Sequence, residues 1–318
     1  MSKRGIFCLV AVASVLVMLF LASSTDWLIT EKAVEIHQVS VLVDAEDDHG
    51  LSNFKLGLEQ AAMRLNADLS FITLYDEKEP EQQGTLLLRE VNSGAQGIIL
   101  LAENASSMEK MLGDVPVNVP VVIYGSSVDS PRVKAVLCPS WVSIAKDLAK
   151  VIISENGTKL KVTIVTTTKN KTNVETMKNT MLLAITQAGA EVSMVQLQSL
   201  DDVKTLADGL TAQGGNIVFT PELNTLEVLA QSIGTQADKL PLYGVGWSGT
   251  IWHSVENGYI KATVVCNDYN GGYLALRELK ASLDGKNDNR EGSEIPYAVV
   301  NKENLYTDEI ETMLFPIW

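Results

Sequence analysis

Positive charge and cysteine are both scarce in this sequence. Its 318 residues hold 25 Lys and Arg against 39 Asp and Glu, which gives a formal net charge of −14. That balance argues against a nucleic-acid partner, because phosphate binding needs clustered Lys and Arg. Of the three cysteines, only Cys138 and Cys266 lie outside an apolar N-terminal segment, and two cysteines do not make a disulfide framework.

Catalytic and metal-binding motifs are also missing. The histidines His37, His49 and His253 are isolated, with no metal-ligand spacing to Cys, Asp or Glu. The sequence has neither Gly-x-Ser-x-Gly nor a phosphate-binding loop, and Gly244-Val-Gly-Trp-Ser-Gly departs from the dinucleotide fingerprint in place and spacing. We therefore expect a protein that is not an enzyme and that uses no cofactor and no metal ion.

One long hydrophobic run stands near the N-terminus. Gly5 to Ala22 contains 18 uncharged residues, and Lys3 and Arg4 precede it. As a helix, this run is just long enough to span the hydrocarbon core of a membrane, with the basic flank in the cytoplasm and the later residues outside. A cleaved signal peptide is the alternative, but the run is longer than the usual apolar core of such peptides. We favour a single-pass anchor.

From residue 38 onward, short apolar runs alternate with segments of helical period. The pattern predicts strands at 39–43, 69–74, 97–101 and 120–124, then again at 160–165, 192–197, 217–220, 242–245 and 262–265, with helices between them. This is typical of βαβ units around buried parallel sheets. Two successive halves of similar length favour two Rossmann-like lobes. A TIM barrel also fits the alternation, although its eight units need not divide near Cys138.

Several segments resemble the ribose-binding-protein branch of the type I periplasmic binding proteins. These are Gly57-Leu-Glu-Gln-Ala-Ala, Gly94-Ala-Gln-Gly-Ile-Ile-Leu, Val119-Pro-Val-Val, Gly258-Tyr-Ile-Lys-Ala-Thr-Val-Val with Asn267-Asp-Tyr and Gly272-Tyr-Leu-Ala-Leu, and Val299-Val-Asn-Lys-Glu-Asn-Leu. Each segment is weak alone, but their order and spacing together cover nearly all of residues 38–306. The stretch from Ser23 to Glu31 is similar to anchored clostridial members that accompany sensor histidine kinases.

The resemblance implies how the chain is divided. A cytoplasmic tip and anchor (or signal peptide) would occupy 1–25 and a linker 26–37. The N-terminal lobe would be 38–138 plus 268–295, and the C-terminal lobe 140–266 plus 297–314. The hinge would contain Cys138, Ser140, Cys266 and Asp268, with the two thiols within several Å of each other. Whether they are bonded stays open, because a disulfide also needs facing β-carbons.

The expected ligand cleft lies between the lobes, at the carboxyl ends of the strands. This sequence departs from the sugar-binding pattern of the family at most positions, for instance with Gly125-Ser126 after the fourth strand and Cys266 in place of the hinge Gln. Aromatic faces suit a sugar ring, and carboxylates accept bonds from hydroxyls. On these grounds the predicted ligand residues are Asp47, Asp48, Leu51, Tyr124, Ser126, Trp141, Glu222, Trp247, Asn267 and Asp268.

For two parts of this set, a short run of residues and one tryptophan, the structural alternative carries similar weight. The run from Asp47 to Gly50, which includes His49, also fits a solvated turn with a helix N-cap. Trp141 lies close to a crossing between the lobes, where packing in the hinge is as plausible as ligand contact.

The sequence thus predicts a membrane-anchored extracytoplasmic solute-binding protein, most simply for a sugar or sugar-like ligand. Its partner would be an ABC permease or a membrane sensor histidine kinase. A degenerate module that binds a protein and no small molecule is the alternative, since the polar residues of the cleft depart from the family pattern.

Overall fold

The computed structural model describes residues 3–24, 36–44, 51–74, 82–102, 104–157, 160–167, 171–234, 238–286 and 293–316. The chain divides into two compact units, Met1–Ile36 and His37–Trp318. The first unit contains helix α1 (Lys3–Ser24), which is exposed along its described side chains. Within the described residues, α1 is the one helix long and apolar enough to cross a membrane, a test that a signal sequence also passes.

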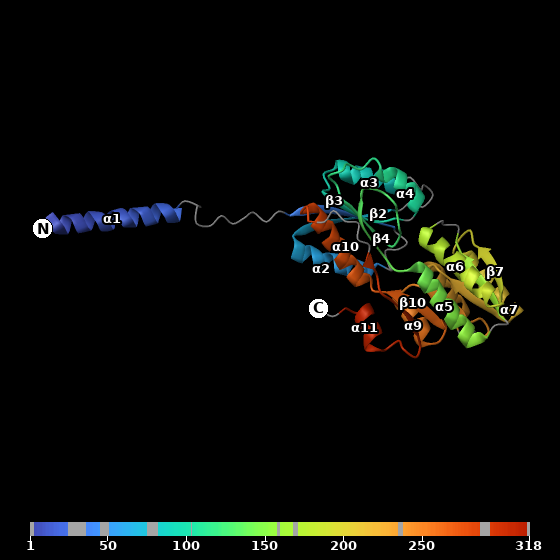
Figure 1. The fold of residues 1–318 in the computed structure, drawn as a ribbon. Helices are drawn as coiled ribbons and strands as arrows, with labels where there is room; N and C mark the ends of the chain where they lie inside the picture. The colour runs from blue at the N-terminus through green and yellow to red at the C-terminus, as the bar shows by residue number, and fades with distance from the viewer. Residues whose placement is uncertain are drawn as a thin grey trace. The chain divides into compact units, whose positions relative to one another are not determined.

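The second unit holds two six-stranded sheets, each in its own lobe (Figure 1). The first sheet has the order β11-β5-β4-β3-β1-β2, and its neighbouring strands run parallel to one another. Its strands are β1 (His37–Asp44), β2 (Ala67–Leu74), β3 (Gly97–Leu101), β4 (Val121–Tyr124), β5 (Val133–Cys138) and β11 (Ser293–Glu294). The helices of this lobe are α2 (Ser52–Leu65), α3 (Gln82–Asn92), α4 (Ala105–Leu112) and α10 (Asp268–Leu283).

The second sheet has the order β12-β10-β9-β8-β6-β7. Its strands are β6 (Lys161–Thr166), β7 (Glu191–Gln196), β8 (Asn216–Thr220), β9 (Leu242–Val245), β10 (Ala262–Cys266) and β12 (Tyr297–Asn301), of which β12 runs antiparallel to β10. The helices are α5 (Trp141–Asn156), α6 (Thr172–Gln187), α7 (Asp202–Gln213), α8 (Leu223–Ile233), α9 (Gly249–Glu256) and α11 (Asp308–Leu314). Two separate sheets exclude a single barrel, and the predicted two-lobe α/β fold is confirmed.

The central strands are buried because helices cover both faces of each sheet. All residues of β3, β4, β8 and β9 are buried, which explains their continuous apolar runs. The helices bury one stripe only. In α5, for example, the buried residues recur at the spacing of one helical face: Ile144, Ala145, Leu148, Ala149 and Ile152. Each lobe therefore has two core clusters, one on each side of its sheet.

Helices α2 and α10 lie side by side on the first lobe although more than 200 residues of chain separate their starts (Figure 1). Two glycines allow this contact. A Cβ on Gly57 would lie 2.0 Å from the Tyr269 carbonyl oxygen, and one on Gly272 would lie 2.1 Å from the Phe54 carbonyl oxygen. Backbone cannot move aside as a flexible side chain can, so both positions require glycine. This packing fixes the start of α10, where the hinge enters the first lobe.

The chain passes between the lobes three times. It goes from β5 to α5, from β10 to α10, and from β11 to β12. The crossings are hydrogen-bonded to one another: the Ile295 amide donates to the Cys138 carbonyl at 3.1 Å, and the Asn267 amide donates to the Pro296 carbonyl at 2.9 Å. The lobes are therefore joined by neighbouring backbone segments rather than by one flexible linker.

Candidate ligand-binding cleft

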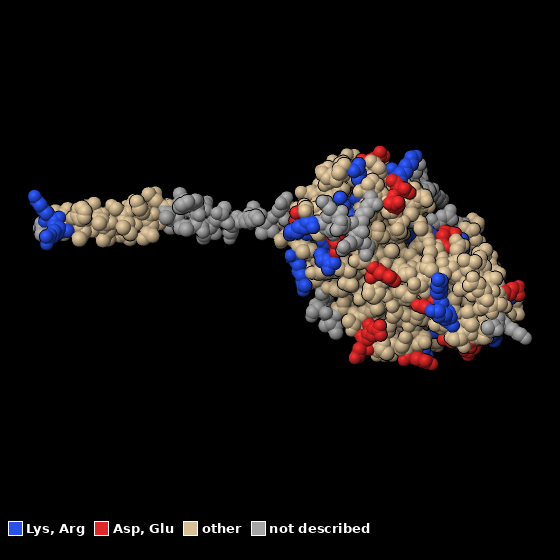
Figure 2. All heavy atoms as spheres, viewed as in Figure 1, with Lys and Arg blue, Asp and Glu red and all other residues tan. Residues whose placement is uncertain are grey.

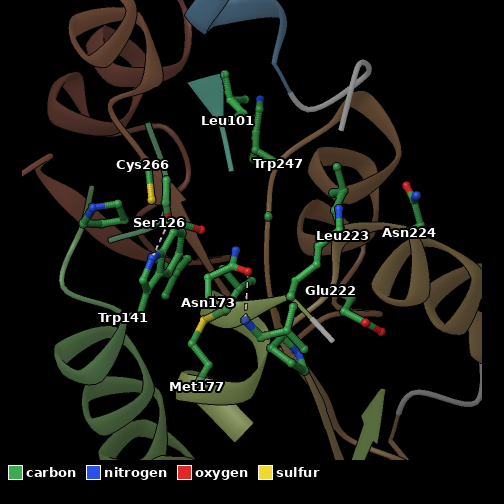
Figure 3. Close-up of a pocket in the computed structure, with 18 of the residues that line it drawn as sticks. Leu101, Ser126, Trp141, Asn173, Met177, Glu222, Leu223, Asn224, Trp247 and Cys266 are labelled. Carbon is green, nitrogen blue, oxygen red and sulfur yellow. Dashed lines mark hydrogen bonds between the residues drawn. The ribbon is translucent and has the colours of Figure 1, made fainter. Parts of the chain in front are cut away.

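A cavity of about 220 Å³ lies between the two lobes (Figure 3). It is built at the carboxyl ends of strands from both sheets, which is where open α/β sheets place their ligands. Its apolar lining includes Leu51, Leu101, Trp141, Val174, Met177, Leu200, Leu223, Val245, Trp247 and Val264. Its polar lining includes Tyr124, Ser126, Lys171, Asn173, Glu222, Asn224 and Asp268.

Tyr124 and Asp268 form a buried pair on the hinge side of the cavity. The Tyr124 hydroxyl, at the end of β4, donates a short hydrogen bond to the Oδ1 atom of Asp268, in the first turn of α10. The Tyr124 ring packs on Phe54 with a centroid distance of 4.2 Å, and a Cβ on Gly271 would lie 2.5 Å from the same ring. The ring is thus held on two sides, and its hydroxyl is aimed at the carboxylate.

Burial changes the protonation of both partners. It raises the pKa of the Asp268 carboxyl to about 6, although the Tyr124 hydrogen bond acts in the opposite direction. Burial also raises the Tyr124 pKa well above its usual value, and the nearby Asp268, Cys266 and Cys138 add to this effect. At neutral pH the pair is therefore a neutral phenol and a mostly ionised, poorly solvated carboxylate.

The predicted hinge residues lie at the crossings. Cys138 ends β5 and Cys266 ends β10, and both thiols are free. Burial raises the pKa of each thiol, so both are neutral at physiological pH. Ser140 caps the N-terminus of α5, with its Oγ atom accepting from the Ser143 amide at 3.2 Å. The distance between the two sulfur atoms stays a prediction.

Trp141 connects the two lobes directly. It is the first residue of α5 in the second lobe, and its indole Nε1–H donates to the Gly125 carbonyl at the end of β4, at 2.8 Å. Its ring still lines the cavity (Figure 3). The hinge role and the ligand-contact role predicted for Trp141 are therefore compatible. Its nitrogen makes a hydrogen bond between the lobes, and its ring lines the cleft.

Glu222 has a structural role in its own lobe. Its carboxylate accepts from the Thr167 amide at 2.8 Å, from the Thr167 hydroxyl at 2.9 Å and from the Thr225 hydroxyl at 3.0 Å. These bonds join the end of β6 to the start of α8. Three of about four acceptor positions of the carboxylate are occupied, so a ligand would find little of it available.

Trp247 links the cavity to an aromatic cluster. Its ring meets Trp252 edge-on at 5.1 Å between centroids, and Trp252 in turn contacts Tyr306 at 5.2 Å and Phe315 at 5.4 Å. Such edge-to-face pairs fix ring orientation. The Trp247 face is thus held in place where the second lobe borders the cleft.

Of the other predicted ligand residues, some line the cavity and some do not. Leu51 and Ser126 line the cavity. Asn267 does not; its Oδ1 atom accepts from the Asn270 amide at 3.1 Å and caps α10. Asp47 and Asp48 lie outside the described residues.

Sequence reasoning missed several cavity residues. Leu101 ends β3, while Asn173 and Asn224 lie in the first turns of α6 and α8. The strand-end rule alone would have found them, since Leu101 is the last residue of a strand and the two asparagines lie at the start of the helix that follows a strand.

Two hydrogen bonds join the lobes away from the hinge. The Ala105 amide at the start of α4 donates to the Thr172 hydroxyl at the start of α6, at 3.1 Å. The Asn53 side chain in α2 donates to the Leu314 carbonyl in α11, at 2.8 Å. Both depend on the lobes being close together, so the structure represents a state with contacts across the cleft.

On the face of the second unit that Figure 2 shows, basic and acidic side chains gather over different helices. Figure 2 shows basic side chains over α2 and α10 and acidic ones over α11, whose first turn contains Asp308, Glu309 and Glu311. No group of three or more metal-ligating side chains occurs among the residues that were described. The cleft offers hydrogen-bonding groups, aromatic rings and the largely buried carboxylate of Asp268, which are groups suited to binding a ligand.

Solved structures share this fold. A carbohydrate transporter solute-binding protein from Agrobacterium radiobacter, in complex with D-arabinose, matches with a TM-score of 0.79 at 19% identity over 88% of this chain and 99% of its own. GanP, a glucose-galactose binding protein from Geobacillus stearothermophilus, matches with a TM-score of 0.75 at 17% identity over 86% and 99%. A chain of the XylFII–LytSN complex matches with a TM-score of 0.74 at 19% identity over 85% and 99%.

No curated protein matches the sequence significantly. The family model described as periplasmic binding protein domain matches residues 39–287. This range includes both sheets except β12, β11 and the first two residues of β1, and it includes every cavity residue named above. The chain therefore belongs to the periplasmic binding protein family.

Proposed function

We propose that this protein is an extracytoplasmic solute-binding receptor whose two lobes close on a sugar or sugar-like ligand. The observation that carries this proposal is the cavity between the lobes, with strand ends from both sheets around it. The rings of Trp141 and Trp247 suit the apolar face of a sugar ring. The fold shared with carbohydrate-binding proteins supports the same ligand class.

The interlobe hydrogen bonds of Ala105 and Asn53 form only when the two lobes are close together, so a ligand that closes the lobes also favours these bonds. A ligand that contacts both lobes binds the closed state better than the open one, and it shifts the population by that difference in affinity. Closure thereby changes the outer surface that a partner protein meets.

A membrane-anchored sensor is the second candidate for how closure is used. An ABC permease would receive the solute from the closed lobes, whereas a sensor histidine kinase would read closure itself. The match to a chain of the XylFII–LytSN complex favours the second route, because a protein of this fold there assembles with another protein. In both cases α1 would hold the domain at the extracytoplasmic face of the membrane.

A thermal-shift screen of the purified full-length chain tests the proposal. A ligand that binds only the native state must raise the melting temperature, and the rise must grow as the ligand concentration is increased above the dissociation constant. We expect a response to at least one sugar, polyol or amino sugar. The Trp247→Ala variant should bind that compound more weakly by about 1 kcal/mol or more, while Val117→Ala, at a residue that is 73% exposed, should bind it unchanged. No response to any compound would favour a module that binds only a protein.

Anchoring is tested separately by fractionation. An uncleaved α1 places the full-length protein in the membrane fraction with its Met1 end intact. Recovery of a soluble form that begins near Thr25 would show that the helix is a removed signal sequence instead.

A further inference from the structure

Asp268 lines the cavity, and its carboxylate has one oxygen, Oδ2, that accepts no hydrogen bond from the described residues. Among the described residues, the Asp268 carboxylate accepts one hydrogen bond, which runs from the Tyr124 hydroxyl to its other oxygen, Oδ1. Oδ2 receives no donor from those residues, and it is not among the buried atoms that lack a partner, so it keeps accessible surface. Because Asp268 lines the cavity, this surface is available to a ligand.

A single neutral donor compensates a buried carboxylate only in part. An ionised carboxylate that is removed from water needs a counter-charge or several hydrogen bonds. Among the described residues, the titratable neighbours that face Asp268 are Tyr124 from β4 and Cys266 from β10, and neither supplies positive charge. The Asp268 pKa is raised to about 6 because burial disfavours the charged carboxylate more than the Tyr124 hydrogen bond stabilises it.

The rest of the cavity also favours a cation. Its described charged side chains are Lys171, Glu222 and Asp268, which sum to one negative charge. The rings of Trp141 and Trp247 offer electron-rich faces to an ammonium group. The net charge of −14 attracts cationic solutes toward the protein.

We propose that the ligand is an amino sugar or a similar amine-bearing polyol, whose protonated amine pairs with Asp268 while its ring lies against the tryptophans. This inference rests on the proposed function, since it names the ligand class of the same cleft. Glu222 is not the anchor, because its oxygens already hold the loop between β6 and α8. The amine replaces the missing counter-charge of Asp268.

Calorimetric titration of the full-length chain with matched compounds tests this inference. The probes are glucosamine and galactosamine, their parent sugars glucose and galactose, and the uncharged N-acetyl forms. We expect at least one amine to bind at pH 7.5 at least tenfold more tightly than its parent sugar and its N-acetyl form. The preference should fall about tenfold between pH 7 and pH 5, because protonation of Asp268 removes its charge.

The Asp268→Asn variant should lose the preference for amines, and the matched surface variant Asp208→Asn should keep it. Equal or tighter binding of the neutral sugars overturns the amine inference and leaves the proposed function standing. A preference that survives Asp268→Asn overturns the assigned anchor. Failure of every compound to bind contradicts the proposed function itself.

Discussion

Two carboxylates border the same cleft, and the structure gives them opposite roles. Glu222 accepts three hydrogen bonds from Thr167 and Thr225 of its own lobe, whereas Asp268 accepts one, from Tyr124. The first is a structural connection between β6 and α8. The second is a largely buried carboxylate whose Oδ2 atom accepts no hydrogen bond from the described residues, and we propose that a ligand uses it. Residue type and position at a strand end therefore do not define a ligand contact. A carboxylate is available to a ligand only where hydrogen-bond donors of the protein do not already occupy its oxygens.

The largest effect should follow from removing Glu222. The Glu222→Ala variant leaves the Thr167 amide and two hydroxyls without their acceptor, and hydrogen bonds to a charged group contribute about 1.5 kcal/mol or more each. We expect the free energy of unfolding to fall by about 4 kcal/mol in urea denaturation. Glu59→Ala, at an exposed position on α2, should change it by less than about 0.5 kcal/mol. A loss as small as that of the control would show that the three bonds are not structural.

Asp268→Asn should act in the opposite direction. The folded-state pKa of about 6 is above the unfolded value, so ionisation of Asp268 costs stability at every pH above 6. At about 1.4 kcal/mol per pKa unit the cost is roughly 3 kcal/mol, and it disappears as the pH falls from 6 to 4. The variant should be more stable than the parent at pH 7.5 by roughly 2 kcal/mol, with the difference shrinking toward pH 4.5. Urea denaturation at both pH values measures this; a variant less stable at pH 7.5 would refute the uncompensated charge.

Removing the Tyr124 hydroxyl, the one donor to the Asp268 carboxylate among the described residues, should have a smaller effect. Tyr124→Phe keeps the ring against Phe54 but loses the hydroxyl. We expect about 1.5 kcal/mol of destabilisation at pH 7.5. The Asp268 pKa should rise further, because the hydrogen bond that lowers it is gone. Carboxyl resonances followed by NMR across pH 5–8 measure this shift, and an unchanged or lower pKa would contradict the pairing.

The smallest expected effect concerns Asn267. Its side chain caps α10 and does not line the cavity, so Asn267→Ala should cost about 1 kcal/mol of stability and leave ligand affinity unchanged. A selective loss of affinity would return Asn267 to the ligand residues predicted from the sequence.

The two lobes were predictable from the sequence because strands that are buried on both faces consist almost entirely of apolar residues. β3, β8 and β10 are nearly or wholly buried, and their continuous apolar runs were identified as strands of parallel sheets. β12 was not identified as a strand, since its residues are mostly half-buried at the edge of the sheet and it runs antiparallel to β10. An edge strand carries a weaker pattern than a central one.

The site was predictable in position but not in the use of each atom. Tyr124, Trp141, Trp247 and Asp268 all line the cavity, as the strand-end rule suggested. The Glu222 carboxylate accepts a hydrogen bond from Thr167, which lies 55 residues earlier in the chain. The Trp141 indole nitrogen donates its hydrogen bond to Gly125. No local pattern encodes these partners, because Thr167 meets Glu222 only when the second lobe has folded, and Gly125 meets Trp141 only when the two lobes come together.

The most direct test compares Glu222→Gln and Asp268→Asn in calorimetric titrations with the tightest-binding compound of the sugar and amine panel at pH 7.5. The account predicts that Asp268→Asn weakens binding at least tenfold and that Glu222→Gln, measured well below its melting temperature, changes the affinity less than about threefold. The reverse order, or equal losses in both variants, would contradict the division between a structural and a ligand-facing carboxylate.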